Sequence, residues 1–203
     1  MSEHYNMRGF QQGQHVLRDL CESHDVIALQ EHWLSDCNLS EINNIHYNFV
    51  AISKSAMSER LQRGVLRGRP FGGLAVLARK SLVHSLTLLA VDSACRCLAV
   101  LAKLHTGHVV LIVNVYLPCF SANSDYESAI NDCVGFIENC LVCYDYNSVV
   151  LLGHFKFECD IRNSGYRILS NLLHDHNLQC CDSLAIPAVD YTYFQDLLLV
   201  DPQ

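Results

Sequence analysis

The chain has 203 residues, which is long enough for one domain with a sizeable core and does not require a second domain. Half of the residues are hydrophobic and only 17% are charged, a composition that excludes an intrinsically disordered chain. The formal net charge of −7 argues against non-specific binding of the whole surface to a polyanion.

Hydrophobic periodicity predicts alternating strands and helices along the chain. In the first half we expect strands at residues 5–10, 26–29, 47–52 and 72–77, and a helix at residues 15–24. In the second half we expect an antiparallel hairpin of strands at residues 97–104 and 109–116, helices at residues 125–143 and 164–174, and strands at residues 148–152 and 191–194. Ser124 or Asp125 is placed to cap the longer helix. This order predicts a mixed sheet flanked by helices and does not support an all-parallel sheet.

No segment is typical of a membrane span or a secretory signal. The longest apolar stretch, residues 109–118, is interrupted by Asn114 and is too short to cross a bilayer. The first residues, from Met1 to His4, are neither basic nor apolar. We therefore expect an intracellular protein with no membrane partner, and the sequence does not distinguish the nucleus from the cytoplasm.

The chain has eleven cysteines, and without a secretory signal a disulfide framework is a poor interpretation. Cys95 and Cys97 are expected on one face of a strand because of the two-residue period. Cys140 and Cys143 have CxxC spacing, but no second pair completes a zinc site. Most cysteines are therefore expected to be small buried hydrophobes.

Positive charge is concentrated in the segment from residue 54 to residue 69. It holds five cations and the single acid Glu59, so it carries +4 and leaves −11 for the rest of the chain. The cations are Lys54, Arg60, Arg63, Arg67 and Arg69. The segment is either a local surface that contacts phosphates or a solvated loop whose arginines pair with acids elsewhere.

Polar residues follow two predicted strands at the points where α/β proteins usually place their chemistry. Glu31 follows the strand at residues 26–29, and His154 and Lys156 follow the strand at residues 148–152. Each has a simpler interpretation when taken alone, because a strand-end acid is often only solvated. Asn6 could satisfy a turn, and Tyr116 could be a core aromatic residue. Trp33 is expected to pack, and Gly72-Gly73 is expected to meet a backbone requirement for close sheet packing.

Five segments, in this order, resemble the endonuclease/exonuclease/phosphatase superfamily. Their spacing is most similar to that of the endonuclease domains of non-LTR (LINE-type) retrotransposons. The segments are Asn6-Met7-Arg8-Gly9, Leu29-Gln30-Glu31-His32-Trp33, Gly72-Gly73-Leu74-Ala75, Asn114-Val115-Tyr116-Leu117-Pro118 and Gly153-His154-Phe155-Lys156.

The resemblance implies a four-layer α/β sandwich, in which two mixed β-sheets lie face to face with helices outside. It implies a Mg²⁺-dependent (or Mn²⁺-dependent) phosphodiesterase that cuts DNA. Glu31 would be the main metal ligand, Asn6 would orient the metal–phosphate site, and Tyr116 would contact the phosphate. The basic segment would contact the DNA backbone, and the parent element would also contain a reverse transcriptase domain.

The chain departs from the family pattern at two sites. His154 stands where the family has an Asp that orients or deprotonates water, and Lys156 stands where it has an Asn that holds the phosphate. The family also has an Asp-His pair after a TYF-like segment, whereas this chain ends at Pro202-Gln203. We therefore expect a single domain over residues 1–203, incomplete at its C-terminus, with weak or absent activity and an exposed sheet edge.

Two other functions remain open on the same fold. One is a non-catalytic module that binds nucleic acid or protein through the basic segment and Lys156. The other is a phosphatase for small molecules, which the basic segment and the motif spacing favour least.

Overall fold

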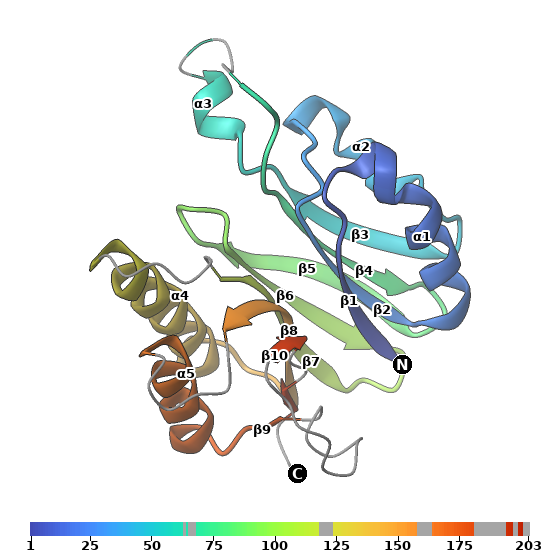
Figure 1. Cartoon of the computed structure of the whole chain (residues 1–203). Helices are drawn as coiled ribbons and strands as arrows, with labels where there is room; N and C mark the ends of the chain where they lie inside the picture. The colour runs from blue at the N-terminus through green and yellow to red at the C-terminus, as the bar shows by residue number, and fades with distance from the viewer. Residues whose placement is uncertain are drawn as a thin grey trace.

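Two β-sheets lie face to face, and each has helices on its outer side (Figure 1). The computed structural model describes residues 1–62, 64, 68–117, 124–157, 164–180, 194–196 and 199–200. The strands are β1 (Ser2–Asn6), β2 (Val26–Gln30), β3 (Phe49–Lys54), β4 (Leu74–Arg79), β5 (Val83–Val91), β6 (Cys97–Leu104), β7 (Val109–Tyr116), β8 (Ser148–Phe157), β9 (Gln179–Cys180), β10 (Phe194–Asp196) and β11 (Leu199–Val200). The helices are α1 (Phe10–Ser23), the short 3-10 helix η1 (Asp36–Asn38), α2 (Ser40–Asn43), α3 (Ser58–Gln62), α4 (Ser124–Cys143) and α5 (Ser164–Asp175).

Both sheets are mixed. Within the described residues the first sheet has the order β1-β2-β4-β3, and the second has the order β5-β6-β7-β8-β11-β9, with β10 also paired to β8. Strands β1 and β2 run parallel, as do β7 and β8, whereas β6 and β7 form the predicted antiparallel hairpin. The predicted mixed topology is therefore confirmed.

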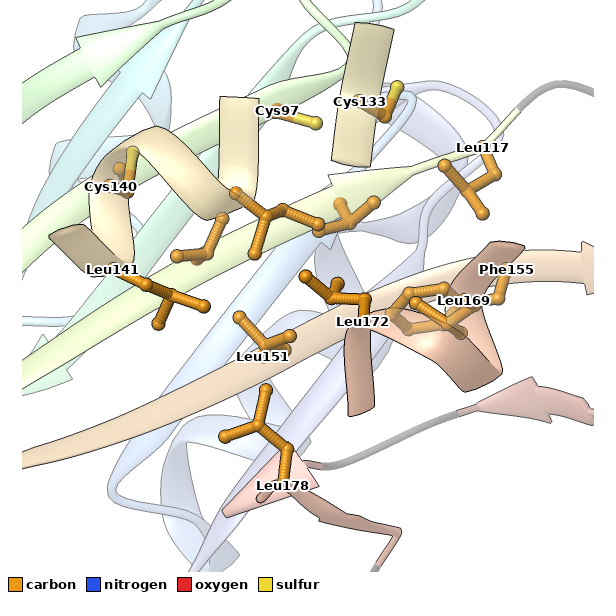
Figure 2. Packing of buried hydrophobic residues seen from close by; sticks show 14 of the residues in the cluster. Cys97, Leu117, Cys133, Cys140, Leu141, Leu151, Phe155, Leu169, Leu172 and Leu178 are labelled. Atoms are coloured by element: carbon orange, nitrogen blue, oxygen red, sulfur yellow. The ribbon is translucent and has the colours of Figure 1, made fainter. Parts of the chain in front are cut away.

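Three buried apolar layers hold the sandwich together. Between α1 and the first sheet, Leu17 packs with Ile27 and Leu29. Between the two sheets lies a second cluster that includes Leu98 of β6. Between the second sheet and helices α4 and α5, side chains such as Phe155, Leu169 and Leu172 pack together, as Figure 2 shows. Three layers of core between four layers of backbone confirm the predicted four-layer α/β sandwich.

Several predicted boundaries are wrong. The first strand ends at Asn6, and Phe10 already begins α1, five residues before the predicted helix start. Strand β5 was not predicted, and α3 lies inside the segment that was expected to be a loop. Strand β8 continues through Gly153 to Phe157, so His154 lies within a strand and not beyond its end. Helices α4 and α5 lie where the periodicity predicts them.

Four of the described cysteines, Cys21, Cys97, Cys133 and Cys140, are buried free thiols, whereas Cys95 is half-buried and Cys37 and Cys143 are exposed. Cys97 is fully buried next to Cys133 of α4 (Figure 2). Cys95 does not share its strand, because it lies in the turn before β6 with a φ of 52°. Among the described residues, no group of three His, Cys, Asp or Glu side chains could hold a metal ion. The same part of the chain contains no helix long and apolar enough to cross a membrane.

The outer edge of β8 is covered. Strands β10 and β11 both pair antiparallel with it, and β9 pairs with β11. Within the described residues, this side of the second sheet therefore ends at β9 and not at β8. Of the predicted strand at residues 191–194, the first three residues lie outside the described residues, and Phe194 begins β10.

A buried amide pair joins the two sheets. The Nδ2 atom of Asn114 in β7 donates to the carbonyl oxygens of Leu29 at 2.8 Å and Ala75 at 2.9 Å, both in the first sheet. In return, Nε2 of Gln30 donates to Oδ1 of Asn114 at 2.7 Å. Both side chains are fully buried. Because a buried amide is costly unless it is hydrogen-bonded, this pair fixes the register between the sheets.

We expect Asn114→Ala to lower the free energy of unfolding by about 3 kcal/mol, because it leaves a buried amide of Gln30 and two carbonyls short of partners and opens a cavity. Urea denaturation measures the change. Asn131→Ala on the exposed face of α4 is the matched control and should change stability by less than about 0.5 kcal/mol. Equal stabilities of the two variants would show that the amide pair is not needed for sheet pairing.

Gly153 allows β7 and β8 to approach closely. A Cβ atom added at this position would overlap the carbonyl oxygen of Val115, which is backbone and cannot rotate away. In contrast, a Cβ atom added to Gly135 in α4 would meet nothing within 4 Å. We therefore expect Gly153→Ala to cost at least about 3 kcal/mol, near the upper end for overpacking. Gly135→Ala should be neutral or stabilise by up to about 1 kcal/mol, since Ala favours helices. Urea midpoints would contradict this expectation if Gly153→Ala matched the wild type.

Candidate active site

The predicted site residues gather where strands of both sheets end. Asn6 ends β1 opposite Gln30, the last residue of β2, and Glu31 follows directly. In the other sheet, Tyr116 ends β7 opposite His154 of β8. Two residues predicted from separate motifs are therefore neighbours in each sheet, and the two pairs face one another.

Glu31 and Tyr116 join the two sheets at this end. The Tyr116 hydroxyl donates a hydrogen bond to Oε1 of Glu31. The backbone holds Glu31 in a left-handed conformation with a φ of 56°. Its N–H donates to the carbonyl of Gly73 at 2.9 Å, and its carbonyl accepts from Gly9 at 2.8 Å. A non-glycine residue with positive φ is uncommon, so this turn aims the carboxylate at a defined point.

His154 stacks on Tyr116. The two rings have centroids 6.1 Å apart and planes inclined by 15°. The ring of His4 in β1 lies 6.5 Å from that of His154. The structure therefore brings His154 to the site, next to the tyrosine that contacts Glu31. Lys156 lies in β8, but its side chain is outside the described residues.

Asn6 is half-buried at the end of β1. Its Oδ1 accepts a hydrogen bond from the N–H of Arg8 at 3.3 Å, as the turn interpretation predicts. Asn6 pairs with Gln30 in the β1–β2 ladder, so its backbone lies next to the residue that precedes Glu31. The Asn6 amide and the Glu31 carboxylate offer hard oxygen donors, which Mg²⁺ prefers, and Mg²⁺ needs few protein ligands because it retains water molecules. The donor set therefore fits a magnesium ion bound mainly through one carboxylate.

A cleft with a volume of about 710 Å³ opens beside Glu31. It is lined by the ends of β2 and β3, the turn between β5 and β6, and Tyr116. Lys54 is the member of the basic segment that lines it. Arg69 is exposed and is not among the lining residues, whereas Arg63, Arg67 and the side chain of Arg60 lie outside the described residues. The structure therefore places one predicted cation at the site.

Sequence reasoning missed the opposite wall of the cleft, the β5–β6 turn, which we define as residues 91–96. Asp92 in this turn accepts three backbone N–H groups, from Ala94 at 3.1 Å, Arg96 at 2.6 Å and Cys97 at 2.5 Å. Aspartate before small residues is a turn signal, but it becomes visible only once β5 is recognised. The adjoining Cys95 is no nucleophile, because burial raises the pKa of its thiol to about 12.

His32 holds the turn after β2 in place. It is fully buried, its Nδ1 accepts from the N–H of Leu34 at 3.0 Å, and its Nε2 donates to the carbonyl of Lys54 at 3.0 Å. The ring lies against Gly73, where a Cβ atom would overlap it. The glycine requirement is therefore real, but it accommodates a histidine ring and not the facing sheet. Trp33 is half-buried and lies against Gly9, as the packing interpretation predicts.

Burial lowers the pKa of His32 to about 4, and the hydrogen bond to Lys54 opposes this shift only in part. The unfolded chain binds a proton below about pH 6.5, whereas the folded chain does not until about pH 4. The contribution of His32 to stability is therefore present above pH 6.5 and is lost as the pH falls towards 4, by about 3 kcal/mol in total.

We expect the free energy of unfolding to fall less steeply with acidification in His32→Gln than in the wild type. Urea denaturation at a series of pH values between the two pKa values measures this slope. Exposed His84 provides the control, since His84→Gln should retain the wild-type slope. Parallel pH curves for His32→Gln and the wild type would contradict the assignment.

Solved structures with this fold include enzymes that act on phosphate esters. The 3′ phosphatase NExo from Neisseria, solved with a product DNA hairpin, is 15% identical with a TM-score of 0.71, and the match covers 99% of this chain and 86% of that chain. An AP endonuclease from Archaeoglobus fulgidus is 13% identical with a TM-score of 0.66, and the match again covers 99% and 86%. A mannosyl-6-phosphatase from Bacteroides thetaiotaomicron is 14% identical with a TM-score of 0.66, covering 99% and 85%. These likenesses show the fold and not the substrate.

Sequence comparison gives the family directly. No curated protein matches the chain. The sequence profile of the Endonuclease/Exonuclease/phosphatase family, however, matches residues 4–198, nearly the whole chain. That span includes both pairs of strand ends and the β5–β6 turn. The chain therefore belongs to the Endonuclease/Exonuclease/phosphatase family.

Proposed function

We propose that the chain is a Mg²⁺-dependent phosphodiesterase domain of the DNA endonuclease type, with weak or absent hydrolytic activity. The observation that carries this proposal is that Glu31, Tyr116 and Lys54 line one cleft, where Tyr116 contacts Glu31, and that His154 stacks on Tyr116. These side chains come from strands β3, β7 and β8 and from the turn after β2, which are far apart in sequence. Their convergence gives a negative group, a hydroxyl donor and a cation around one hollow.

Each of these residues has a role in binding a phosphodiester. The Glu31 carboxylate would hold the ion, with the Asn6 amide next to it. When bound, Mg²⁺ would neutralise phosphate charge and stabilise the leaving oxygen. The Tyr116 hydroxyl orients the carboxylate and lies within the lining of the cleft, so it can also donate to a phosphate oxygen. Lys54 would attract the phosphate as a point charge.

The side chains at this site are poorly suited to activating a water molecule. His154 stands where the family pattern has an acid, and its charged form would be repelled by a nearby divalent cation. Its neutral form has a single acceptor nitrogen, whereas a carboxylate has two acceptor oxygens. Lys156 adds a positive charge to the same strand. Binding therefore remains favourable, while proton removal from water is impaired.

The retrotransposon ancestry rests on motif order and spacing. The segments around Glu31, Gly73, Tyr116 and Gly153 follow one another as they do in LINE-type endonuclease domains. We accordingly propose that residues 1–203 form one domain that acts inside the cell, and that its parent element encodes a reverse transcriptase.

A second candidate is a binding module that has lost catalysis on the same fold. The histidine at position 154 specifically favours it, because this change affects water activation and leaves the Glu31–Tyr116 contact intact. The two candidates differ in turnover and share a cleft, so one set of variants separates them.

The test is nicking of supercoiled plasmid with Mg²⁺. We expect little or no nicking by the wild type, and at least about a hundredfold more by the double variant His154→Asp/Lys156→Asn, since a positioned general base contributes about that factor or more. Adding Glu31→Gln to the double variant should abolish the gain. Chelation of Mg²⁺ should do the same.

Three results would revise the proposal. Wild-type nicking at the rate of the double variant would show that His154 does not impair the site. No nicking by either, together with DNA binding, would favour the binding module. Hydrolysis of a small phosphomonoester without nicking would favour a phosphatase.

A further inference from the structure

The β5–β6 turn separates two hollows at the same end of the molecule. The first is the cleft beside Glu31. The second has a volume of about 420 Å³ and lies between this turn and α4. Residues 92–94 and Arg96 line both hollows. A ligand longer than one phosphate ester could therefore pass from the cleft over the turn into the second hollow.

Backbone hydrogen bonds hold Arg96 in place, while its side chain is available to bind a ligand. Its carbonyl accepts from the N–H of Tyr116 at 2.7 Å, and its N–H donates to Asp92 at 2.6 Å. Within the described residues, its guanidinium takes part in no hydrogen bond or ion pair. A half-buried arginine with a rigid backbone and a free guanidinium next to Tyr116 is well placed to bind a phosphate.

The other residues of the β5–β6 turn do not repel a bound anion. Asp92 directs both carboxylate oxygens at backbone N–H groups, which offset its negative charge. Ser93 and Ala94 are small and exposed. On the far side, Gly135, Phe136 and Asn139 of α4 line the second hollow, together with the acid Asp132. An aromatic ring and an amide next to an acid suit a base better than a phosphate.

We propose that a nucleic-acid strand leaves the cleft across the β5–β6 turn, with one phosphate on Arg96 and the adjoining base in the second hollow against α4. This inference rests on the proposed function and deepens it, because a small phosphate ester would occupy only the cleft. It makes the substrate a polynucleotide strand that contacts the protein at more than one nucleotide.

The first test measures binding of a fluorescent single-stranded DNA of roughly ten nucleotides by anisotropy, at several salt concentrations. EDTA is present, so that binding is read without turnover. We expect Arg96→Gln to weaken binding about tenfold, as loss of one charge-assisted contact would. It should also reduce the slope of log K against log salt by about 0.7, since one phosphate contact is lost. Arg96→Lys should keep most of this slope.

Two matched variants accompany this measurement. Lys103→Gln removes a charge from the exposed far end of β6, the strand that follows Arg96, and should leave binding unchanged. Lys54→Gln removes a charge from the cleft itself and should weaken binding. The effect of Lys54→Gln tests the proposed function, and the effect of Arg96→Gln tests the path of the strand. One proposal can therefore be contradicted while the other is supported.

The second test uses the open space at Gly135. Gly135→Trp should fill the second hollow without disturbing α4, since an added Cβ atom meets nothing within 4 Å. We expect it to remove the gain in affinity that the longer strand has over a dinucleotide, whereas Gly135→Ala should keep that gain. This test does not depend on how well any Arg96 variant folds.

Each contrary outcome is decisive. If Lys54→Gln weakens binding but Arg96→Gln behaves like Lys103→Gln, the inference is wrong and the proposed function stands. If Gly135→Trp binds the long strand as well as Gly135→Ala does, the strand does not enter the second hollow. If the wild type binds no strand at any salt concentration, both the inference and DNA as the substrate are wrong.

Discussion

The site depends on the buried amide pair between Asn114 and Gln30. Each residue lies in an otherwise apolar interior, where an unbonded amide would be costly. Glu31 directly follows Gln30, and Tyr116 lies two residues beyond Asn114 on the same face of β7. A register shift of one residue would turn Asn114 and Tyr116 toward the helices and leave Gln30 without its partner. The bond that aligns the sheets therefore also aligns the carboxylate with the hydroxyl.

The same alternation places His154. Val150 and Leu152 face the other sheet in β8, so the side chain two residues later points the same way, toward Tyr116. Gly153 lets this strand approach β7 closely enough for the two rings to stack. Position 154 is thus fixed by the fold and does not depend on which side chain occupies it. A change of chemistry there leaves the architecture intact, which is why fold and activity can separate at this residue.

Much of the fold is predictable from sequence because its core strands and helices have clear periods. Val26–Gln30 and the helix at Ser124–Cys143 are examples. Strand β5 was missed because polar residues such as His84 and Ser85 interrupt its pattern at a sheet edge. Glu31 and Tyr116 were found through motifs, but their mutual contact requires the sheet pairing. Arg96 could not be predicted as a site residue from the sequence. The concentration of positive charge lies between Lys54 and Arg69, and a single arginine beside a turn has no feature that distinguishes it.

The histidine at position 154 also changes the electrostatics of binding. An aspartate there would add a second carboxylate near Glu31, and the two like charges would depend on a metal ion to hold a phosphate. With histidine the cleft has the carboxylate of Glu31 and that of Asp92, which already accepts three backbone N–H groups, and Lys54 and Arg96 line the same cleft and offset this charge. Local charge governs contacts within a Debye length of about 10 Å, so the overall charge of −7 does not prevent a phosphate from binding here. If the proposed function is correct, a histidine in place of an aspartate at position 154 disfavours water activation and also makes the cleft less repulsive to a polyanion, so it favours holding a strand over cutting it.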